Sequence, residues 1–181
     1  MNTKKIKRLP YGNSNFKSVM TENYLYVDKT RFIEQLERES NKNQFFIRPR
    51  KFGKSLFFSM LSYYYDMGQA ASFEELFGGL YIGKNPTPLK NSYAVMDFDF
   101  SGLDTSTPEN FKKSFEQYVQ RTVCIFLEKY KSVFPRAMEL IEEIVRTQEG
   151  SGSLRTAMRM SRFLLSSTSM TILQTTLLQW V

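Results

Sequence analysis

The segment from residue 45 to residue 68 constrains the fold most, because it joins three patterns that belong to different structures. Residues 45–47 form a short apolar run, which predicts a buried strand, and Pro49 closes that run. After a basic loop, apolar side chains recur every three or four residues and predict a helix that ends near Gly68. These side chains are Leu56, Phe57, Met60, Leu61 and Tyr64. The segment therefore predicts a strand, a loop and a helix in that order.

Strand and helix patterns alternate elsewhere in the chain as well. Residues 24–30 predict a brief strand or turn, and residues 31–40 predict a helix. A second strand is expected over residues 93–100, with Gly102 ending it, and a long helical region over residues 108–145. Because strands that alternate with helices usually form layered domains, we expect an α/β fold with a partial, parallel sheet flanked by helices.

Composition narrows the classes of function. The chain has 181 residues, 41% of them hydrophobic, which suits one globular domain. A net charge of +7 favours anionic partners, and nucleotides, nucleic acid and acidic membrane surfaces all fit that description. The chain has no histidine and one cysteine, Cys124, so zinc sites, disulfides and conventional serine or cysteine hydrolase chemistry are disfavoured. With no apolar signal segment after the basic N-terminus, a reduced, cytoplasmic setting is expected.

The loop after the first predicted strand has the residue types that bind phosphate. Gly53 permits close approach of backbone N–H groups, Lys54 supplies a positive charge, and Ser55 supplies a hydroxyl ligand for Mg²⁺. The helix that follows directs its positive N-terminal dipole at the same point. Arg48 stands where such loops normally have their first glycine, so the alternative interpretation is a basic surface turn.

Five segments, in order, are similar to landmarks of the AAA-ATPase-like family, which is related to archaeal-type ATPases. The segments are "LPYGNSNFKSV", "YVDKTRFIEQL", "RPRKFGKSL", "FEELFGGLYI" and "AVMDFDFSG", and the similarity covers roughly residues 8 to 150. In that family the loop is a degenerate Walker A motif in which arginine replaces the first glycine. The resemblance implies a P-loop NTPase-like fold over residues 1–150 and ATP binding with Mg²⁺.

The resemblance also implies roles for individual residues. Lys54 is expected on the β- and γ-phosphates and Ser55 on Mg²⁺. Arg50 and Lys51 either contact phosphates or form the solvated side of the loop. The residues assigned to nucleotide binding are Arg48, Pro49, Arg50, Lys51, Phe52, Gly53, Lys54 and Ser55.

Hydrolysis requires further carboxylates that hold the Mg²⁺ shell and position water. Asp97 and Asp99 lie on one face of the second predicted strand. Resemblance to the family places the hydrolytic acids on a later strand, so we assign these two no catalytic role. Asp28 and Lys29 either approach the nucleotide or stabilise a turn. Without a Walker B motif, we expect binding and no hydrolysis.

The tail, residues 151–181, differs from the rest of the chain. From Phe163 onward it carries no charge and is rich in Ser, Thr and Leu. This composition makes a membrane span a weak interpretation, and a final core helix is the alternative. When each codon's last base is joined to the next codon's first two, Met170 and Thr171 encode aspartate. Permitted codons over residues 165–175 then spell Ile-Ile-Asp-Glu-Tyr-Asp-Asn-Phe-Ala-Asn, the family's hydrolytic segment. We therefore expect a shifted reading frame beginning between about residues 150 and 165, and a truncated ATPase.

Two other functions fit parts of the sequence. A non-enzymatic nucleic-acid-binding module would use the basic arm of residues 4–8 and the basic loop, with Phe45, Phe46 and residues 63–65 as stacking surfaces. A helical interaction scaffold would rest on residues 111–145, whose apolar stripe is ordinary core material.

Overall fold

The computed structural model describes residues 7–39, 44, 46–134, 136, 139 and 142, and the backbone of residues 174–177. The chain divides into two compact units, Met1–Ser92 and Tyr93–Val181, and each is described by itself. The expected boundary at residue 150 and most of the tail after it lie outside the described residues.

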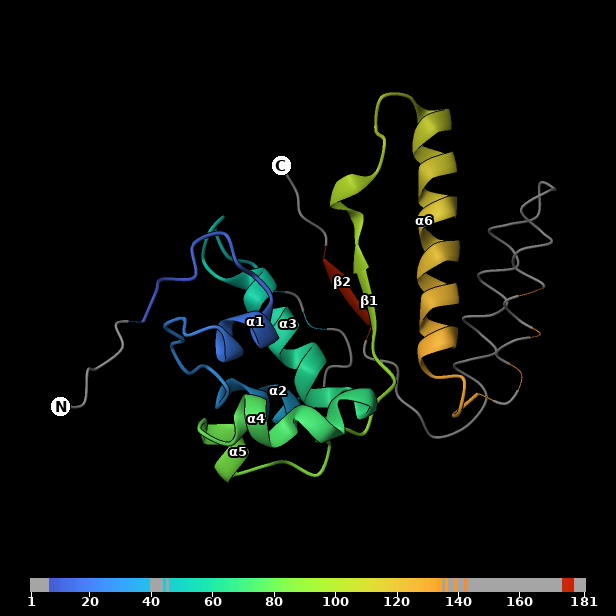
Figure 1. The fold of residues 1–181 in the computed structure, drawn as a ribbon. Coiled ribbons are helices and arrows are strands. Elements are labelled where there is room, and N and C mark those ends of the chain that lie inside the picture. The colour runs from blue at the N-terminus through green and yellow to red at the C-terminus, as the bar shows by residue number, and fades with distance from the viewer. Residues whose placement is uncertain are drawn as a thin grey trace. The chain divides into compact units, whose positions relative to one another are not determined.

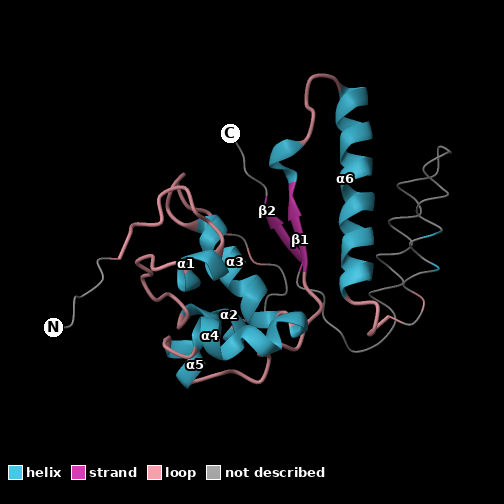
Figure 2. Cartoon of the chain, viewed as in Figure 1, coloured by secondary structure: helices cyan, strands magenta, loops and turns pink. Residues whose placement is uncertain are grey.

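The described part of the first unit is helical (Figures 1 and 2). Its elements are α1 (Phe16–Thr21), α2 (Phe32–Arg38), α3 (Lys54–Tyr65), the 3-10 helix η1 (Met67–Ser72), α4 (Phe73–Phe77) and α5 (Tyr81–Lys84). An aromatic core joins α1, α3 and α4, with the ring centre of Phe77 5.0 Å from that of Phe16 and 5.6 Å from that of Tyr64. These rings are buried, so the three helices share one hydrophobic core.

A hydrogen-bonded turn links the start of α2 to the start of α5. One carboxylate oxygen of Asp28 accepts from the backbone N–H of Thr30 at 2.8 Å and from its hydroxyl at 2.7 Å. The other accepts from the N–H of Tyr81 at 2.8 Å. The hydroxyl of Thr30, which is 0% exposed, accepts from the N–H of Ile82 at 3.2 Å. This turn is therefore a structural link between two segments about fifty residues apart in the chain.

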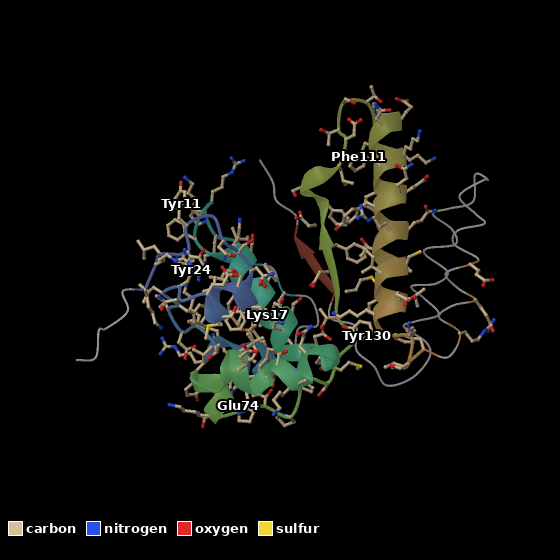
Figure 3. The ribbon with its side chains drawn as sticks, in the orientation of Figure 1. Tyr11, Lys17, Tyr24, Glu74, Phe111 and Tyr130 are labelled. Carbon is tan, nitrogen blue, oxygen red and sulfur yellow. The ribbon has the colours of Figure 1, made fainter. Side chains whose placement is uncertain are left out.

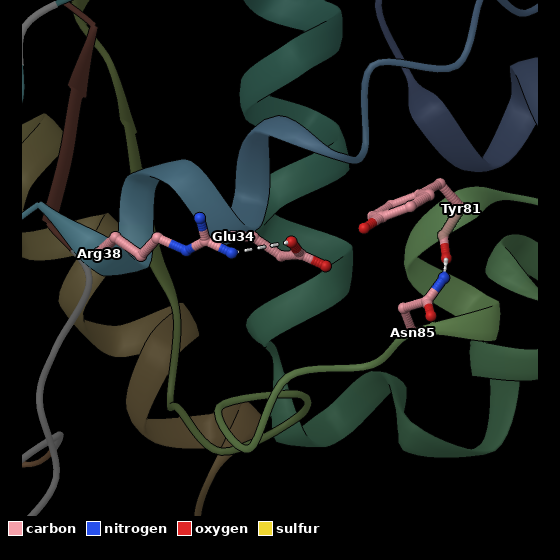
Figure 4. Close-up of polar contacts among 4 residues, drawn as sticks. All are labelled: Glu34, Arg38, Tyr81 and Asn85. Atoms are coloured by element: carbon pink, nitrogen blue, oxygen red, sulfur yellow. Dashed lines mark hydrogen bonds and ion pairs between the residues drawn. The ribbon is translucent and has the colours of Figure 1, made fainter.

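Two further polar contacts lie within α2 and at α5 (Figure 4). Glu34 forms an ion pair with Arg38 one turn later on α2, at 3.6 Å. The hydrogen bond to Glu34 and the negative charge of that carboxylate raise the pKa of the Tyr81 phenol. The carbonyl of Tyr81 accepts from the side-chain amide of Asn85 at 3.1 Å, which closes α5.

The helix predictions for this unit are confirmed, whereas the predicted strand at residues 45–47 is wrong. Residues 46–49 are not in a strand, residue 45 lies outside the described part, and Ile47 is 90% exposed. A strand needs hydrogen-bonded neighbours, and no described residue pairs with this segment. Phe46 packs instead against Phe57 and Phe58 of α3, with ring centres 5.2 and 5.3 Å apart.

The helix after the loop ends earlier than expected. Asp66 follows α3 with extended backbone (ψ 118°), and its carboxylate accepts from the N–H of Gly68 at 2.7 Å. This side chain caps η1, so the chain changes direction at Asp66 and not at Gly68.

The second unit contains β1 (Met96–Asp99), the 3-10 helix η2 (Phe100–Gly102), α6 (Pro108–Lys129) and β2 (Gln174–Leu177). The two strands pair in parallel, with Met96 opposite Gln174. Thr107 caps α6 by accepting from the N–H of Asn110 at 3.1 Å, and proline occupies the first helical position. The phenol of Tyr130, labelled in Figure 3, accepts a hydrogen bond from the N–H of Val95 at 2.9 Å. This bond links the end of α6 to the residue before β1.

Three predictions meet different outcomes here. The helix starting at Pro108 is confirmed, but its continuation to residue 145 lies largely outside the described residues. The strand expected over residues 93–100 is shorter, because only 96–99 pair. The described residues are mostly helical with two short parallel strands, so they lack the larger sheet expected for an α/β domain.

We predict that Asp28→Ala lowers the free energy of unfolding by about 1–2 kcal/mol, because it leaves the buried Thr30 hydroxyl without its acceptor. Urea unfolding followed by circular dichroism measures the change. Asp104→Ala is the matched control, since Asp104 makes the same turn with Ser106, but both residues are exposed. An equal or larger loss in the control would contradict the prediction.

The carboxylate of Asp28 also makes the stability of the chain depend on pH. Partial burial acts to raise the pKa of Asp28, but hydrogen bonds from Thr30 and Tyr81 outweigh it and hold the pKa below its usual value. Because the unfolded pKa is about 3.9, the stabilisation is present above that pH and disappears as the pH falls through the lower folded pKa. The difference between wild type and Asp28→Ala should therefore shrink in acid.

Candidate functional site

The loop that precedes α3 has two residues in the left-handed backbone conformation. Gly53 has φ +75° and is the N-cap of α3, and Lys51 has φ +65°. A Cβ atom at Gly53 would meet no atom within 4 Å, so the loop needs glycine there for its backbone angles and not for space. Because Lys51 adopts a conformation that is strained for a residue with a side chain, the surrounding structure holds this loop in a defined shape.

Lys54 closes the loop on itself. Its ammonium Nζ donates to the carbonyl oxygen of Arg48 at 2.9 Å, which joins the first and seventh residues of the loop. The positive charge is therefore held against the loop.

The N-terminus of α3 adds a second electropositive element. The carbonyl of Gly53 accepts the first helical hydrogen bond from the N–H of Phe57 at 2.9 Å, and no side chain caps the helix. The first N–H groups of an α-helix have no partner within the helix, and the macrodipole of this 12-residue helix places partial positive charge at the same end. The loop and the helix terminus together suit an anion.

A cavity of about 710 Å³ opens beside this loop. Its cationic lining consists of Lys29, Arg48 and Lys54, and Gly53 lines it as well. Its apolar lining comes from α2, α3 and the loop, and consists of Phe32, Leu36, Phe46, Phe52, Phe57 and Phe58. Gln35, Gln44 and Glu39 complete the wall. The cavity thus combines positive charge with an aromatic surface.

The structure brings only part of the predicted loop to this cavity. Arg48, Phe52, Gly53 and Lys54 line it, whereas the remaining loop residues do not. Those remaining residues are Pro49, Arg50, Lys51 and Ser55. Ser55 lies half-buried in the first turn of α3, and Arg50 is exposed.

The first landmark segment lies beside the loop, which the sequence did not indicate. The ammonium of Lys51 lies 5.9 Å from the ring centre of Tyr11, which is 88% exposed (Figure 3). Tyr11 is followed by Gly12, whose φ of +74° makes a tight turn. Lys51 therefore faces this turn at the outer side of the loop. Lys29 lines the cavity. The sequence had left open whether this residue approaches the nucleotide or stabilises a turn.

The two carboxylates to which we assigned no catalytic role lie on β1. Asp97 and Asp99 are both exposed on β1, as their spacing predicted. Asp99 accepts from the N–H of Ser101 at 3.0 Å and so caps η2, and its own N–H donates to the phenol of Tyr118 at 2.6 Å. These contacts agree with a structural role for Asp99.

The stacking surface expected for nucleic acid is mostly used in packing. Tyr64 and Tyr65 are buried, and Phe46 packs against α3.

Burial raises the pKa of the Cys124 thiol, which keeps it a poor nucleophile. Within the described residues, no helix is both long and apolar enough to cross a membrane.

We predict that Gly53→Ala destabilises the chain by about 1–2 kcal/mol, because alanine is strained at positive φ. Gly79→Ala is the matched control, since a Cβ atom there also meets nothing within 4 Å and the backbone is not in the left-handed region. Denaturant unfolding of both variants measures the difference. Equal stabilities would show that the loop relaxes freely out of the left-handed conformation.

Comparison with known proteins identifies the family. The family described as "Predicted AAA-ATPase" matches residues 10–168, which extends past the boundary expected at residue 150. An uncharacterised protein in the vnfD 5′ region of Azotobacter chroococcum mcd 1 is 42% identical over 77 residues. That match covers 42% of this chain and 14% of the relative's length. No solved structure matches the chain. Because the family match spans most of the sequence, the chain belongs to the AAA-ATPase-like family.

Proposed function

We propose that this chain binds ATP, with its phosphates on residues 48–55 and the N-terminus of α3. The observation that carries the proposal is the left-handed Gly53 cap beside Lys54, whose ammonium bonds to the Arg48 carbonyl, at a cavity that three cations line. Membership of a family described as ATPases supports the same ligand. A volume of about 710 Å³ is within the range of small-molecule sites.

Different lining residues of the cavity suit different parts of the nucleotide. The β- and γ-phosphates would bind at Gly53 and Lys54, where the ammonium exchanges the Arg48 carbonyl for phosphate oxygens. The nucleoside would lie along the aromatic wall that includes Phe46 and Phe57. The phosphates would then contact cationic side chains, and the nucleoside would contact apolar side chains.

Mg²⁺ would bind only together with the phosphates, because Ser55 does not itself line the cavity. Ser55, in the first turn of α3, offers one hydroxyl oxygen, the type of ligand that Mg²⁺ prefers. Among the described residues, no three carboxylate, histidine or cysteine side chains gather at one point. Mg²⁺ commonly keeps several waters and shares phosphate oxygens, and the bound ion would neutralise phosphate charge.

We further propose that the chain does not hydrolyse ATP. The sequence contains no Ile-Asp-Glu-Tyr segment in its reading frame, and the shifted codons over residues 165–175 permit one. Sequencing the encoding DNA tests the frame shift, because a shifted frame without the acidic segment would overturn it. Residues 165–173 lie outside the described part of the chain.

We predict that Lys54→Ala weakens binding of a fluorescent ATP analogue by roughly 10- to 100-fold, the value of a charge-assisted hydrogen bond. Titrations with and without Mg²⁺ measure the effect. Lys17→Ala is the control, because it removes the same charge from an exposed position on α1 (Figure 3). Equal affinities for the two variants would rule out the loop as the phosphate site.

Salt distinguishes the nucleic-acid alternative. If binding of a single-stranded oligonucleotide is tight, falls steeply with salt and is unchanged in Lys54→Ala, the chain is a nucleic-acid-binding module. If Mg²⁺-assisted ATP binding is lost in that variant, the nucleotide function stands.

We predict that ATP turnover by the wild type equals that of Lys54→Ala at saturating nucleotide. The physical reason is that the proposed loss of the hydrolytic segment removes the carboxylate that would position the attacking water. The rate of phosphate release measures ATP turnover. Turnover that depends on Lys54 would show that another residue of the chain positions the attacking water.

A further inference from the structure

Lys29 lies between two residues whose side chains are fixed in the first unit. On one side, both oxygens of Asp28 accept hydrogen bonds, from Thr30 and from Tyr81. On the other, the buried hydroxyl of Thr30 bonds to Asp28 and to Ile82. The backbone at Lys29 is therefore held from two directions, although Lys29 itself is exposed.

This fixed position places Lys29 on the cavity that Gly53 and Lys54 also line. Lys29 makes no ion pair with a carboxylate of the described residues. Arg31, two residues later, lies over the ring of Phe32 at 5.4 Å from its centre. Lys29 lines the cavity, whereas Arg31 does not.

The charges around the cavity are unbalanced. Lys29, Arg48 and Lys54 are its cationic lining residues, and Glu39 is the one carboxylate among the described residues that line it. Like charges that face one space repel one another, and a polyanion in that space removes the repulsion. A triphosphate with Mg²⁺ carries enough negative charge to meet several cations.

We propose that Lys29 is a second phosphate-binding cation, which contacts the triphosphate from the side of the cavity formed by the turn before α2. This inference rests on the proposed ATP function and deepens it. Asp28 and Thr30 then serve to position Lys29, and the ligand is held between the α2 and α3 sides of the first unit. Asp28 itself serves a structural role here, because both of its oxygens accept hydrogen bonds from the protein.

The test compares ATP and inorganic tripolyphosphate, which lacks the nucleoside. We expect Lys29→Gln to weaken both ligands by roughly tenfold, and Lys29→Arg to restore most of the affinity. Lys17→Gln, on α1, is the matched control and should change neither affinity. Urea unfolding checks that the turn is intact, since the substitution leaves Asp28 and Thr30 in place.

A readout on the wild type does not depend on any variant folding. Lysine acetylation followed by mass spectrometry should show that tripolyphosphate protects Lys29 and Lys54 and leaves Lys17 reactive. Protection of Lys54 without Lys29, or unchanged affinity in Lys29→Gln, overturns the inference and leaves the proposed function standing. If neither ligand binds the wild type, or if Lys54→Ala has no effect, the proposed function itself fails.

Discussion

The buried hydroxyl of Thr30 and the carboxylate of Asp28 form the contact on which the first unit depends. A buried hydroxyl must have hydrogen-bond partners, and here Asp28 and the N–H of Ile82 supply them. Satisfying this one group fastens the turn before α2 to the start of α5, and Tyr81 adds a bond to the same carboxylate. The cavity wall formed by α2 therefore owes its position in part to a polar contact.

The loop before α3 is shaped by backbone conformation and then by charge. Positive φ at Lys51 and Gly53 turns the chain into the helix, and the Lys54 ammonium closes the turn on the Arg48 carbonyl. Such a loop keeps a cation, a helix N-terminus and a cavity at one place before any ligand arrives. A site that is already arranged loses less conformational entropy when it binds.

The sequence predicted local features that depend on neighbouring residues. The start of α6 at Pro108 and the apolar stripe of α3 follow from short-range geometry, and the structure has both. The strand at residues 45–47 was wrong, because a strand depends on partners from elsewhere in the chain and an apolar run contains no information about them. Phe46 instead found its partners on α3.

The ordered landmarks of the sequence were enough to identify the family, and the residue types of the loop could be read from it directly. Which charged residues share the cavity became evident only in the folded chain. Lys29 lies 25 residues before Lys54, and no periodicity connects them; the bonds of Asp28 and Thr30 to α5 bring them to one space. Long-range hydrogen bonds and side-chain packing set such neighbours, and these depend on the whole folded chain.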